Sequence, residues 1–322
     1  MKIAVLGYYH ALNAGDNRIQ FCINRLVQGH TVVFLPHYLV PPKEYLQSFD
    51  WILIGGGGLV FDPVGIWASP QWISGCRAKI GVLGLGVNRV SADLLKSVSM
   101  LIERSEFFYV GDEQSWALLA HHPKVEVHTD LSWCFPLSQH QGGGEGIALN
   151  LLPCSWKTFR LDNWVNALSG FDVHPFPFHF GKERDADLLR GYFGDRTPTE
   201  FSLEPLQRSE MLVACRFHAV TFAMQMGKPF VAINYDDKVQ RLLADADLSE
   251  CLLETTEPML LAEKIQFVLT HQEFLQRKIA AYAQSQVQKA QQLALAVERH
   301  LEAPCPTPIS LKTIATQLLG GS

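Results

Sequence analysis

A permanent cation and a titratable ring lie two residues apart in the second half of the chain. Arg216 and His218 follow an apolar run at 211–214 that predicts a strand, and a helical pattern begins directly after them. At a strand-to-helix junction both side chains can reach the edge of a sheet, where a helix N-terminus adds positive potential. A guanidinium beside an imidazole suits a substrate that carries phosphate or carboxylate and also needs a proton. The alternative interpretation is that His218 is a structural residue.

Three further polar residues follow the next apolar run of the same block. Tyr235, Asp236 and Lys238 come directly after the strand expected at 230–233. Ligands of α/β proteins bind outside the carboxyl ends of parallel strands. We therefore assign these three residues to substrate binding.

Near the N-terminus, a polar loop joins the first expected strand to the first expected helix. It spans residues 7–17 and contains Asn13, Gly15 and Asp16. Glycine permits close approach of another group to the backbone, and the side chains of Asn13 and Asp16 are expected to touch substrate hydroxyls. The alternative is an ordinary turn in which Asn13 or Asp16 caps the helix. The spacing is not that of the dinucleotide-binding GxGxxG motif.

Two more candidate segments follow apolar runs of the first half. Four glycines, Gly55–Gly58, come directly after residues 51–54, and exposed backbone N–H groups there could cradle an anion. We assign Gly56, Gly57 and Gly58 to substrate binding, and tight packing of backbones is the alternative. Asp112 begins another expected helix, where it is both a candidate cap and a candidate substrate ligand.

These segments need a scaffold that brings the ends of strands together. Short apolar runs alternate with helical patterns, which indicates parallel strands buried on both faces and joined by right-handed crossovers. In the first half, strands are expected at 2–7, 31–35, 51–54, 80–85 and 107–110, with helices at 16–28, 92–104 and 114–120. In the second half, strands are expected at 147–151, 171–175, 211–214 and 230–233, with helices at 183–192, 217–226 and 237–244 and a helical end at 257–302.

A polar, glycine-rich stretch at 136–146 predicts a hinge between two domains. The length of 322 residues also suggests two domains. The expected fold class is therefore α/β, with two Rossmann-like doubly wound domains at 1–138 and 146–302 that face a cleft, followed by a poorly ordered tail at 303–322.

The composition narrows the class of function. A net charge of -5 without a run of Lys and Arg argues against a nucleic-acid partner. Seven cysteines without a CxxC pair predict reduced thiols in a cytoplasmic protein, and no apolar window is long enough for a transmembrane segment. The sequence has no HExxH motif or other metal-ligand cluster, so no metal is expected. Asp185 and Asp187 have the spacing of a metal-binding DxD motif, but we interpret both as first-turn acids that offset a helix dipole.

Taken in order, these motifs resemble the polysaccharide pyruvyl transferase family. They are NxGD after the first strand, GGGG, a D-E-x-S helix start, and R-F-H-A…G-K-P…Y-D-x-K-V, and the resemblance covers residues 1–245. The family has a two-domain fold similar to that of GT-B glycosyltransferases. Its members transfer the pyruvyl group of phosphoenolpyruvate to saccharide hydroxyls, forming a ketal, in the biosynthesis of cell-surface polysaccharides. The resemblance thus implies a transferase that uses phosphoenolpyruvate as co-substrate and no further cofactor.

By position, the resemblance implies roles for single residues. Arg216 would bind the anionic groups of the donor in the C-terminal domain, and His218, when protonated, would deliver a proton to C3 of phosphoenolpyruvate. The acceptor would bind to the N-terminal domain, where Asp16 is the expected general base and Asp112 the second choice. The family usually carries Arg at the position of Gly111, so a second donor-binding cation is expected from elsewhere. The candidates are Arg77, Arg89, Arg104 and Lys238, unless the donor itself differs.

Two alternatives belong to other classes. One is a nucleotide-sugar glycosyltransferase of GT-B type, although no clear Glu-x7-Glu pattern stands where a ribose-binding carboxylate is expected. The other is a non-catalytic sugar-binding relative, for which Gly111 is the supporting feature. The saccharide acceptor is left open as free, lipid-linked or polymeric. The enzyme is expected in the cytoplasm, either unattached or at the inner face of the membrane, and its helical end is compatible with a homodimer as well as with core packing.

Overall fold

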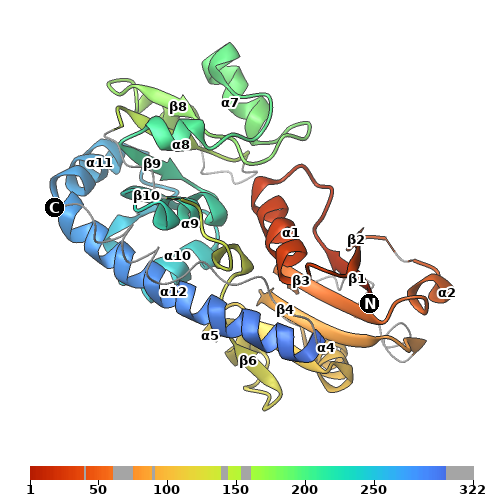
Figure 1. Ribbon diagram of the computed structural model, residues 1–322. Coiled ribbons are helices and arrows are strands. Elements are labelled where there is room, and N and C mark those ends of the chain that lie inside the picture. Colours follow the sequence, from red (N-terminus) through yellow and green to blue (C-terminus); the bar gives the residue numbers. More distant parts are fainter. Residues whose placement is uncertain (40, 61–74, 89–90, 139–143, 154–160, 302–322) are drawn as a thin grey trace. The chain divides into compact units, whose positions relative to one another are not determined.

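The computed structural model describes residues 1–39, 41–60, 75–88, 91–138, 144–153 and 161–301 (Figure 1). The chain divides into two compact units. Unit 1 contains Met1–Ala11, Asp16–Phe135 and residues 286–301, and unit 2 contains Leu12–Gly15 and Pro136–Ser285. Two segments are therefore assigned differently from the domains expected from the sequence. Leu12–Gly15 belongs to unit 2, and residues 286–301 belong to unit 1. The expected tail at 303–322 and residues 139–143 of the expected hinge lie outside the described residues.

Unit 1 contains a six-stranded sheet in the order β2-β1-β3-β4-β5-β6, and each neighbouring pair is parallel. The strands are β1 Lys2–Gly7, β2 Thr31–Pro36, β3 Trp51–Val60, β4 Lys79–Val87, β5 Phe107–Val110 and β6 Val125–Val127. The helices are α1 Ala14–Leu26, α2 Lys43–Leu46, α4 Ala92–Arg104 and α5 Glu113–Leu118, with a 3-10 turn η2 at Leu131–Trp133. The near-continuous apolar strands suit a sheet that is covered on both faces.

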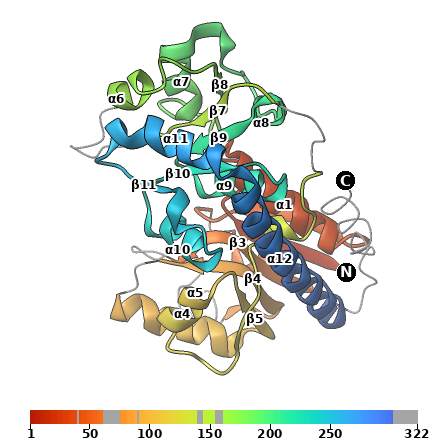
Figure 2. The same ribbon diagram turned by 90° about the vertical axis from the view of Figure 1, so that its left-hand side faces the viewer.

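Helices cover both faces of this sheet (Figure 2). The buried side of α4 joins the core cluster on one face, which includes Ile52, Ile80 and Phe108. On the other face α1 packs on β3. The helix α12 (Gln272–Leu301) begins in unit 2 and ends in unit 1, where its His300 ring lies 4.6 Å from the Phe107 ring of β5. The expectation of a doubly wound sheet is therefore confirmed for unit 1.

The glycine run lies inside strand β3 and does not follow it, which corrects the sequence interpretation. The ladder with β4 continues from Trp51 to Val60, with a register irregularity between Gly57 and Val60. A Cβ atom on Gly56 would stand 2.1 Å from Cγ2 of Ile19, and Gly56 also has φ +73°. Glycine is required there because α1 crosses the strand at close range.

Unit 2 contains a five-stranded parallel sheet in the order β11-β10-β9-β7-β8. The strands are β7 Ile147–Asn150, β8 Val173–Pro175, β9 Met211–Ala214, β10 Phe230–Asn234 and β11 Leu252–Glu254. The helices are α6 Leu161–Asn166, α7 Asp185–Phe193, α8 Glu204–Arg208, α9 Phe217–Gln225, α10 Asp237–Asp245, α11 Leu261–Thr270 and α12 Gln272–Leu301. Three 3-10 turns, η3 Gly194–Arg196, η4 Ser249–Cys251 and η5 Pro258–Leu260, complete the described elements.

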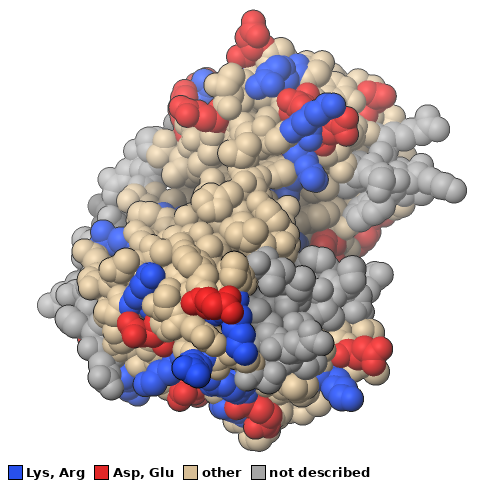
Figure 3. Space-filling view, turned by 90° about the vertical axis from the view of Figure 1, so that its right-hand side faces the viewer, with Lys and Arg blue, Asp and Glu red and all other residues tan. Residues whose placement is uncertain are grey.

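The expected fold class of two parallel-sheet α/β domains is confirmed. The described cysteines, Cys22, Cys76, Cys134, Cys215 and Cys251, are buried and form no disulfide, whereas Cys154 and Cys305 lie outside the described residues. None of the helices in the described ranges has the length and apolar character needed to cross a bilayer. On the face shown in Figure 3, Lys and Arg side chains are interspersed with Asp and Glu.

Candidate functional site

The carboxyl edge of the unit 2 sheet collects polar residues from adjacent strands. Strand β7 ends at Asn150, β9 leads into Arg216, and β10 leads into Tyr235. Strand β8 leads into the segment 176–180. Because neighbouring parallel strands end at one edge, residues that are far apart in the sequence meet here.

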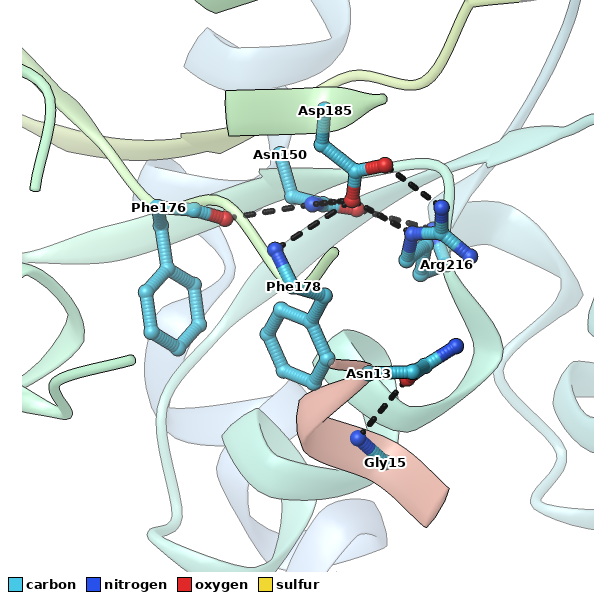
Figure 4. A network of polar contacts seen from close by, with 7 residues as sticks. All are labelled: Asn13, Gly15, Asn150, Phe176, Phe178, Asp185 and Arg216. Carbon is cyan, nitrogen blue, oxygen red and sulfur yellow. Dashed lines mark hydrogen bonds and ion pairs between the residues drawn. The ribbon is translucent and has the colours of Figure 1, made fainter. Parts of the chain in front are cut away.

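The centre of this edge is an ion pair between Arg216 and Asp185, the first residue of α7 (Figure 4). Nε and one terminal nitrogen of Arg216 donate to the two carboxylate oxygens of Asp185, each at 2.5 Å. Asp185 is fully buried, whereas the Arg216 side chain keeps 20% exposure. This fork geometry holds the guanidinium in one orientation and leaves its other edge available to a ligand.

The buried carboxylate of Asp185 receives further donors. Backbone N of Phe178 donates to it at 3.2 Å and Nδ2 of Asn150 at 3.4 Å. Burial by itself would lower the pKa of Arg216, but the hydrogen bonds and charge of Asp185 outweigh burial and raise the pKa. The guanidinium therefore stays charged although it is largely enclosed.

Asn150 joins the ends of three strands. Its Oδ1 accepts from backbone N of Arg216 at 3.1 Å, and its Nδ2 also donates to the carbonyl of Phe176 at 3.1 Å. Its own carbonyl accepts from backbone N of Cys215 at 3.0 Å. This fully buried amide fixes the backbone from which Arg216 projects.

The segment Leu12–Gly15 belongs to the same network (Figure 4). Backbone N of Ala14 donates to the carbonyl of Phe178 at 2.8 Å, and backbone N of Phe180 donates to the carbonyl of Leu12 at 3.1 Å. Oδ1 of Asn13 accepts from backbone N of Gly15 at 3.0 Å, so Asn13 caps the helix as the alternative interpretation held, and its contact with substrate stays a prediction.

The lack of a side chain at Gly15 leaves room for the ring of His218. His218 lies in the first turn of α9 and is half-buried. A Cβ atom on Gly15 would stand 2.2 Å from Nδ1 and 2.6 Å from Cγ of the His218 ring. The structure therefore brings Asn13, Gly15, Arg216 and His218 together, and their roles in substrate binding and catalysis stay predictions.

Replacing Gly15 by Ala is expected to displace the His218 ring and to lower turnover by about 10-fold or more, since misplacement by 1 Å can cost ~100-fold. The fold should tolerate the change, because Gly15 lies in the first turn of α1, whose backbone conformation is open to Ala. Steady-state kinetics and thermal unfolding measure the two effects. Gly191→Ala in α7 is the matched control, since a Cβ atom there meets nothing within 4 Å. Equal activity of the two variants would contradict the assigned contact.

A second cation stands near Arg216. Lys238 hydrogen-bonds the Tyr235 side chain, and its Nζ lies 5.7 Å from the centroid of the Tyr235 ring. Burial would lower the pKa of Lys238, but Tyr235 and Asp236 raise it on balance. Burial is also the largest cause that raises the pKa of Tyr235, and the charge of Arg216 acts on both groups. Lys238 is thus a charged group at the edge that holds Arg216.

Asp236 is the N-cap of α10, and its Oδ1 accepts from backbone N of Lys238 at 3.0 Å. Among the other candidates for the second cation, Arg104 donates to the carbonyls of Cys76 and Ala78 before β4. Arg77 is exposed in that same segment, and Arg89 lies outside the described residues. Lys238 belongs to the same unit as Arg216, and the charge of Arg216 acts on it.

The candidate bases belong to unit 1. Asp16 is half-buried in the first turn of α1, and its Oδ1 is 3.6 Å from the place of a Cβ atom on Gly57. Asp112 caps α5, with its oxygens accepting from backbone N and Oγ of Ser115 at 2.7 and 2.8 Å. Ser115 thus occupies both oxygens of Asp112, and the role of either carboxylate as general base stays a prediction.

The glycines assigned to substrate binding differ in exposure. Gly56 is buried under Ile19, Gly57 is half-buried and Gly58 is exposed. Packing explains Gly56 without a ligand, and only the backbone near Gly58 is open to one. The substrate role of all three stays a prediction.

The role of Asp185 differs from the one expected from the sequence. Its interpretation as a first-turn acid that offsets the helix dipole is incomplete, because the carboxylate is buried against Arg216. Asp187 fits that interpretation better, since its carboxylate accepts from backbone N of Glu183 at 2.9 Å beside the start of α7. No group of His, Cys, Asp and Glu within the described ranges could hold a metal ion. The sequence contains one indication of this network, because Asn150 is an amide at the end of an apolar run that predicts a buried strand.

Comparison by sequence gives one match. A family model described as polysaccharide pyruvyl transferase matches residues 13–237. This range runs from Asn13 to the residue before Lys238 and includes Asn150, Asp185, Arg216 and His218. Curated proteins provide no significant match.

Solved structures of similar chain length share this fold at low sequence identity. A putative UDP-N-acetylglucosamine 2-epimerase from Listeria monocytogenes has a TM-score of 0.60 at 12% identity, covering 96% of this chain and 99% of that chain. The UDP co-structure of S. aureus MnaA has a TM-score of 0.57 at 9% identity, covering 96% and 100%. UDP-GlcNAc 2-epimerase from Neisseria meningitidis, bound to UDP-GlcNAc, has a TM-score of 0.55 at 12% identity, covering 94% and 99%. These similarities establish a shared GT-B-like fold of two parallel-sheet domains.

Proposed function

The chain belongs to the polysaccharide pyruvyl transferase family, and on that premise we propose that it transfers the pyruvyl group of phosphoenolpyruvate to hydroxyls of a saccharide. The observation that carries the proposal is the fixed guanidinium of Arg216, held by Asp185 at a strand end beside His218. Such a group matches the phosphate or carboxylate of the donor, both of which accept paired hydrogen bonds from arginine.

The negative charge of phosphoenolpyruvate leads us to assign Lys238 to the same donor. The positive charge of Arg216 is already compensated by Asp185, so phosphoenolpyruvate needs a further cation. Lys238 supplies it in place of the Arg that the family usually carries at position 111. Tyr235, which hydrogen-bonds Lys238, orients the ammonium group.

The proposed chemistry adds two hydroxyls of one sugar to C2 of the donor. The first hydroxyl forms a C–O bond to C2 while protonated His218 gives its proton to C3, so the vinyl group becomes a methyl group. The second hydroxyl then forms its C–O bond to C2 as the C2–O bond to phosphate breaks, which releases inorganic phosphate and completes the ketal. Asp16 is proposed to accept the proton of the first hydroxyl, and His218, neutral after the first step, that of the second, while Arg216 stabilises the charge on the leaving phosphate. No further cofactor is proposed.

The proposed setting follows from the family. The reaction belongs to the biosynthesis of a cell-envelope polysaccharide, and the acceptor is a saccharide, either free or lipid-linked. The described cysteines, which are buried and form no disulfide, agree with a reducing compartment, for which we propose the cytoplasm. Homodimerisation is a further proposal that equilibrium sedimentation can test.

A nucleotide-sugar enzyme is the second candidate, because structures of the same fold contain UDP or UDP-GlcNAc. Calorimetric titration separates the two. Phosphoenolpyruvate is expected to bind, and UDP- and GDP-sugars are expected not to compete. Binding of a nucleotide sugar without binding of phosphoenolpyruvate would replace the proposed donor.

Replacing Lys238 by Met is expected to weaken phosphoenolpyruvate binding by about 10- to 100-fold, since a hydrogen bond to a charged group contributes about 1.5–3 kcal/mol. Titration at two salt concentrations should also show a smaller salt dependence than in the wild type. Lys182→Met is the control, because its side chain is 90% exposed. Unchanged affinity in Lys238→Met would remove Lys238 from the donor site and reopen the choice of the second cation.

A further inference from the structure

Three aromatic rings meet at the carboxyl edge of the unit 1 sheet. Tyr8 follows β1, and His37 and Tyr38 follow β2. The Tyr8 and His37 rings are stacked with centroids 5.0 Å apart at 30°, and the His37 and Tyr38 rings meet edge to face at 5.6 Å and 81°. We call these three residues the aromatic platform.

The backbone fixes the platform in place. Gly7 and Pro36 are the last register pair of β1 and β2, and backbone N of His37 donates to the carbonyl of Gly7 at 2.8 Å. Tyr8 and His37 therefore stand side by side because the ladder continues by one pair. The residues of the platform directly follow regular strands and do not lie in a long loop.

The platform is not part of the core. Tyr38 is 68% exposed and Tyr8 36%, whereas the neighbouring Tyr9 is 1% exposed and donates its hydroxyl to the carbonyl of Gly55 at 3.1 Å. The fold thus exposes Tyr8 and buries the next residue, Tyr9. Exposed aromatic rings that gather at a strand end indicate a binding surface.

The platform carries no formal charge. No Asp, Glu, Lys or Arg occurs in residues 3–15 or 26–42, and burial lowers the pKa of His37, which keeps the ring neutral near pH 7. A phosphate, a polyanion or a charged peptide finds no counter-charge on these segments. A neutral ligand with an apolar face and a hydroxyl rim suits flat rings that carry hydroxyl and imidazole groups.

We propose that the aromatic platform binds a neutral pyranose ring of the saccharide acceptor. The identification of the ligand as the saccharide acceptor rests on the proposed function. The argument that these rings suit a neutral ligand with an apolar face does not depend on that function. A pyranose stacks its C–H face on a tyrosine ring, while its hydroxyls reach the Tyr and His groups at the rim. The alternative occupant, a second copy of this chain, fits less well because a stable interface needs about 20–30 residues on each side.

Saturation-transfer NMR with the methyl glycosides of glucose, galactose, mannose and N-acetylglucosamine tests the platform. At least one glycoside is expected to receive saturation from the wild type. Tyr8→Ala and Tyr38→Ala are expected to weaken that binding by about 3- to 10-fold, and Tyr38→Trp, which keeps a flat ring, should retain it. Tyr45→Ala is the matched control. Its ring is 40% exposed in unit 1 but lies at the amino end of the strands, with Nζ of Lys2 5.9 Å from its centroid.

Absence of saturation for all four glycosides in the wild type overturns the proposal, as does an equal loss in Tyr45→Ala. A change from dimer to monomer in the platform variants, without an effect on glycosides, would assign the surface to self-association. Calorimetry with phosphoenolpyruvate separates this proposal from the donor assignment, because the platform variants should bind the donor as the wild type does. Glycoside binding by a wild type that does not bind phosphoenolpyruvate would support the platform and overturn the donor.

Discussion

Replacing His218 by Ala is expected to lower kcat by about 10²–10⁴-fold, the usual contribution of a placed proton donor. The loss follows because C3 of the donor must be protonated as the hydroxyl attacks C2, and water is a poorly positioned substitute. Stability should change little, since His218 is half-buried as a residue and does not belong to the apolar core. Release of inorganic phosphate in the presence of phosphoenolpyruvate and an acceptor measures the rate, and thermal unfolding measures stability.

The control for His218→Ala is His122→Ala, which removes a ring that pairs with an exposed glutamate in unit 1. The two variants should unfold at similar temperatures, and only His218→Ala should lose turnover. Phosphoenolpyruvate affinity should stay within a few-fold of the wild type in both, because the proton is needed after binding. Near-normal turnover of His218→Ala would end its assignment as the acid and leave a structural role.

The fold was predictable where the apolar run of a strand or the pattern of a helix is regular and clearly bounded. The sequence predicts the bounds of β1, α4, β5 and β9 as the structure has them. It misses β6 and β11, whose three residues are too few to show a period. The helical end at 257–302 is two helices that break at His271.

The glycine run shows why one strand was cut short. Glycine within a strand is unfavourable on its own, so the sequence indicates an end at Ile54. The ladder continues because β4 is also rich in glycine, and a Cβ atom on Gly86 would stand 3.3 Å from the carbonyl oxygen of Gly57. Only the pairing of the two strands continues the ladder through the run, and that pairing is not visible in either segment alone.

The candidate site was partly predictable for a similar reason. Arg216 and His218 stand at a strand-to-helix junction, which a local pattern reveals. The carboxylate that fixes Arg216 lies 31 positions earlier, and nothing local links the two residues. Backbone hydrogen bonds carry Asn13 and Gly15 into unit 2, and such bonds leave no mark on the sequence.

Removing the carboxylate of Asp185 is expected to have the largest combined effect on stability and binding. Asp185→Ala leaves Arg216 largely enclosed without its partner, and breaking a buried ion pair costs about 3–5 kcal/mol. The lower end of that range is expected here, because the Arg216 side chain keeps 20% exposure. Phosphoenolpyruvate affinity should fall as well, since the guanidinium loses the fork that orients it. Chemical denaturation and calorimetric titration measure the two losses.

A double-mutant cycle separates the structural from the functional part of this loss. Arg216→Met with Asp185→Ala removes both charges, so its stability should recover much of what Asp185→Ala alone loses. Donor binding should not recover, because the cation itself is gone. Arg216→Lys should keep the charge yet bind the donor weakly, since an ammonium group cannot span both oxygens of Asp185 and still present a second edge. If the double variant bound phosphoenolpyruvate as the wild type does, Arg216 would be a purely structural partner of Asp185 and the donor site would lie elsewhere.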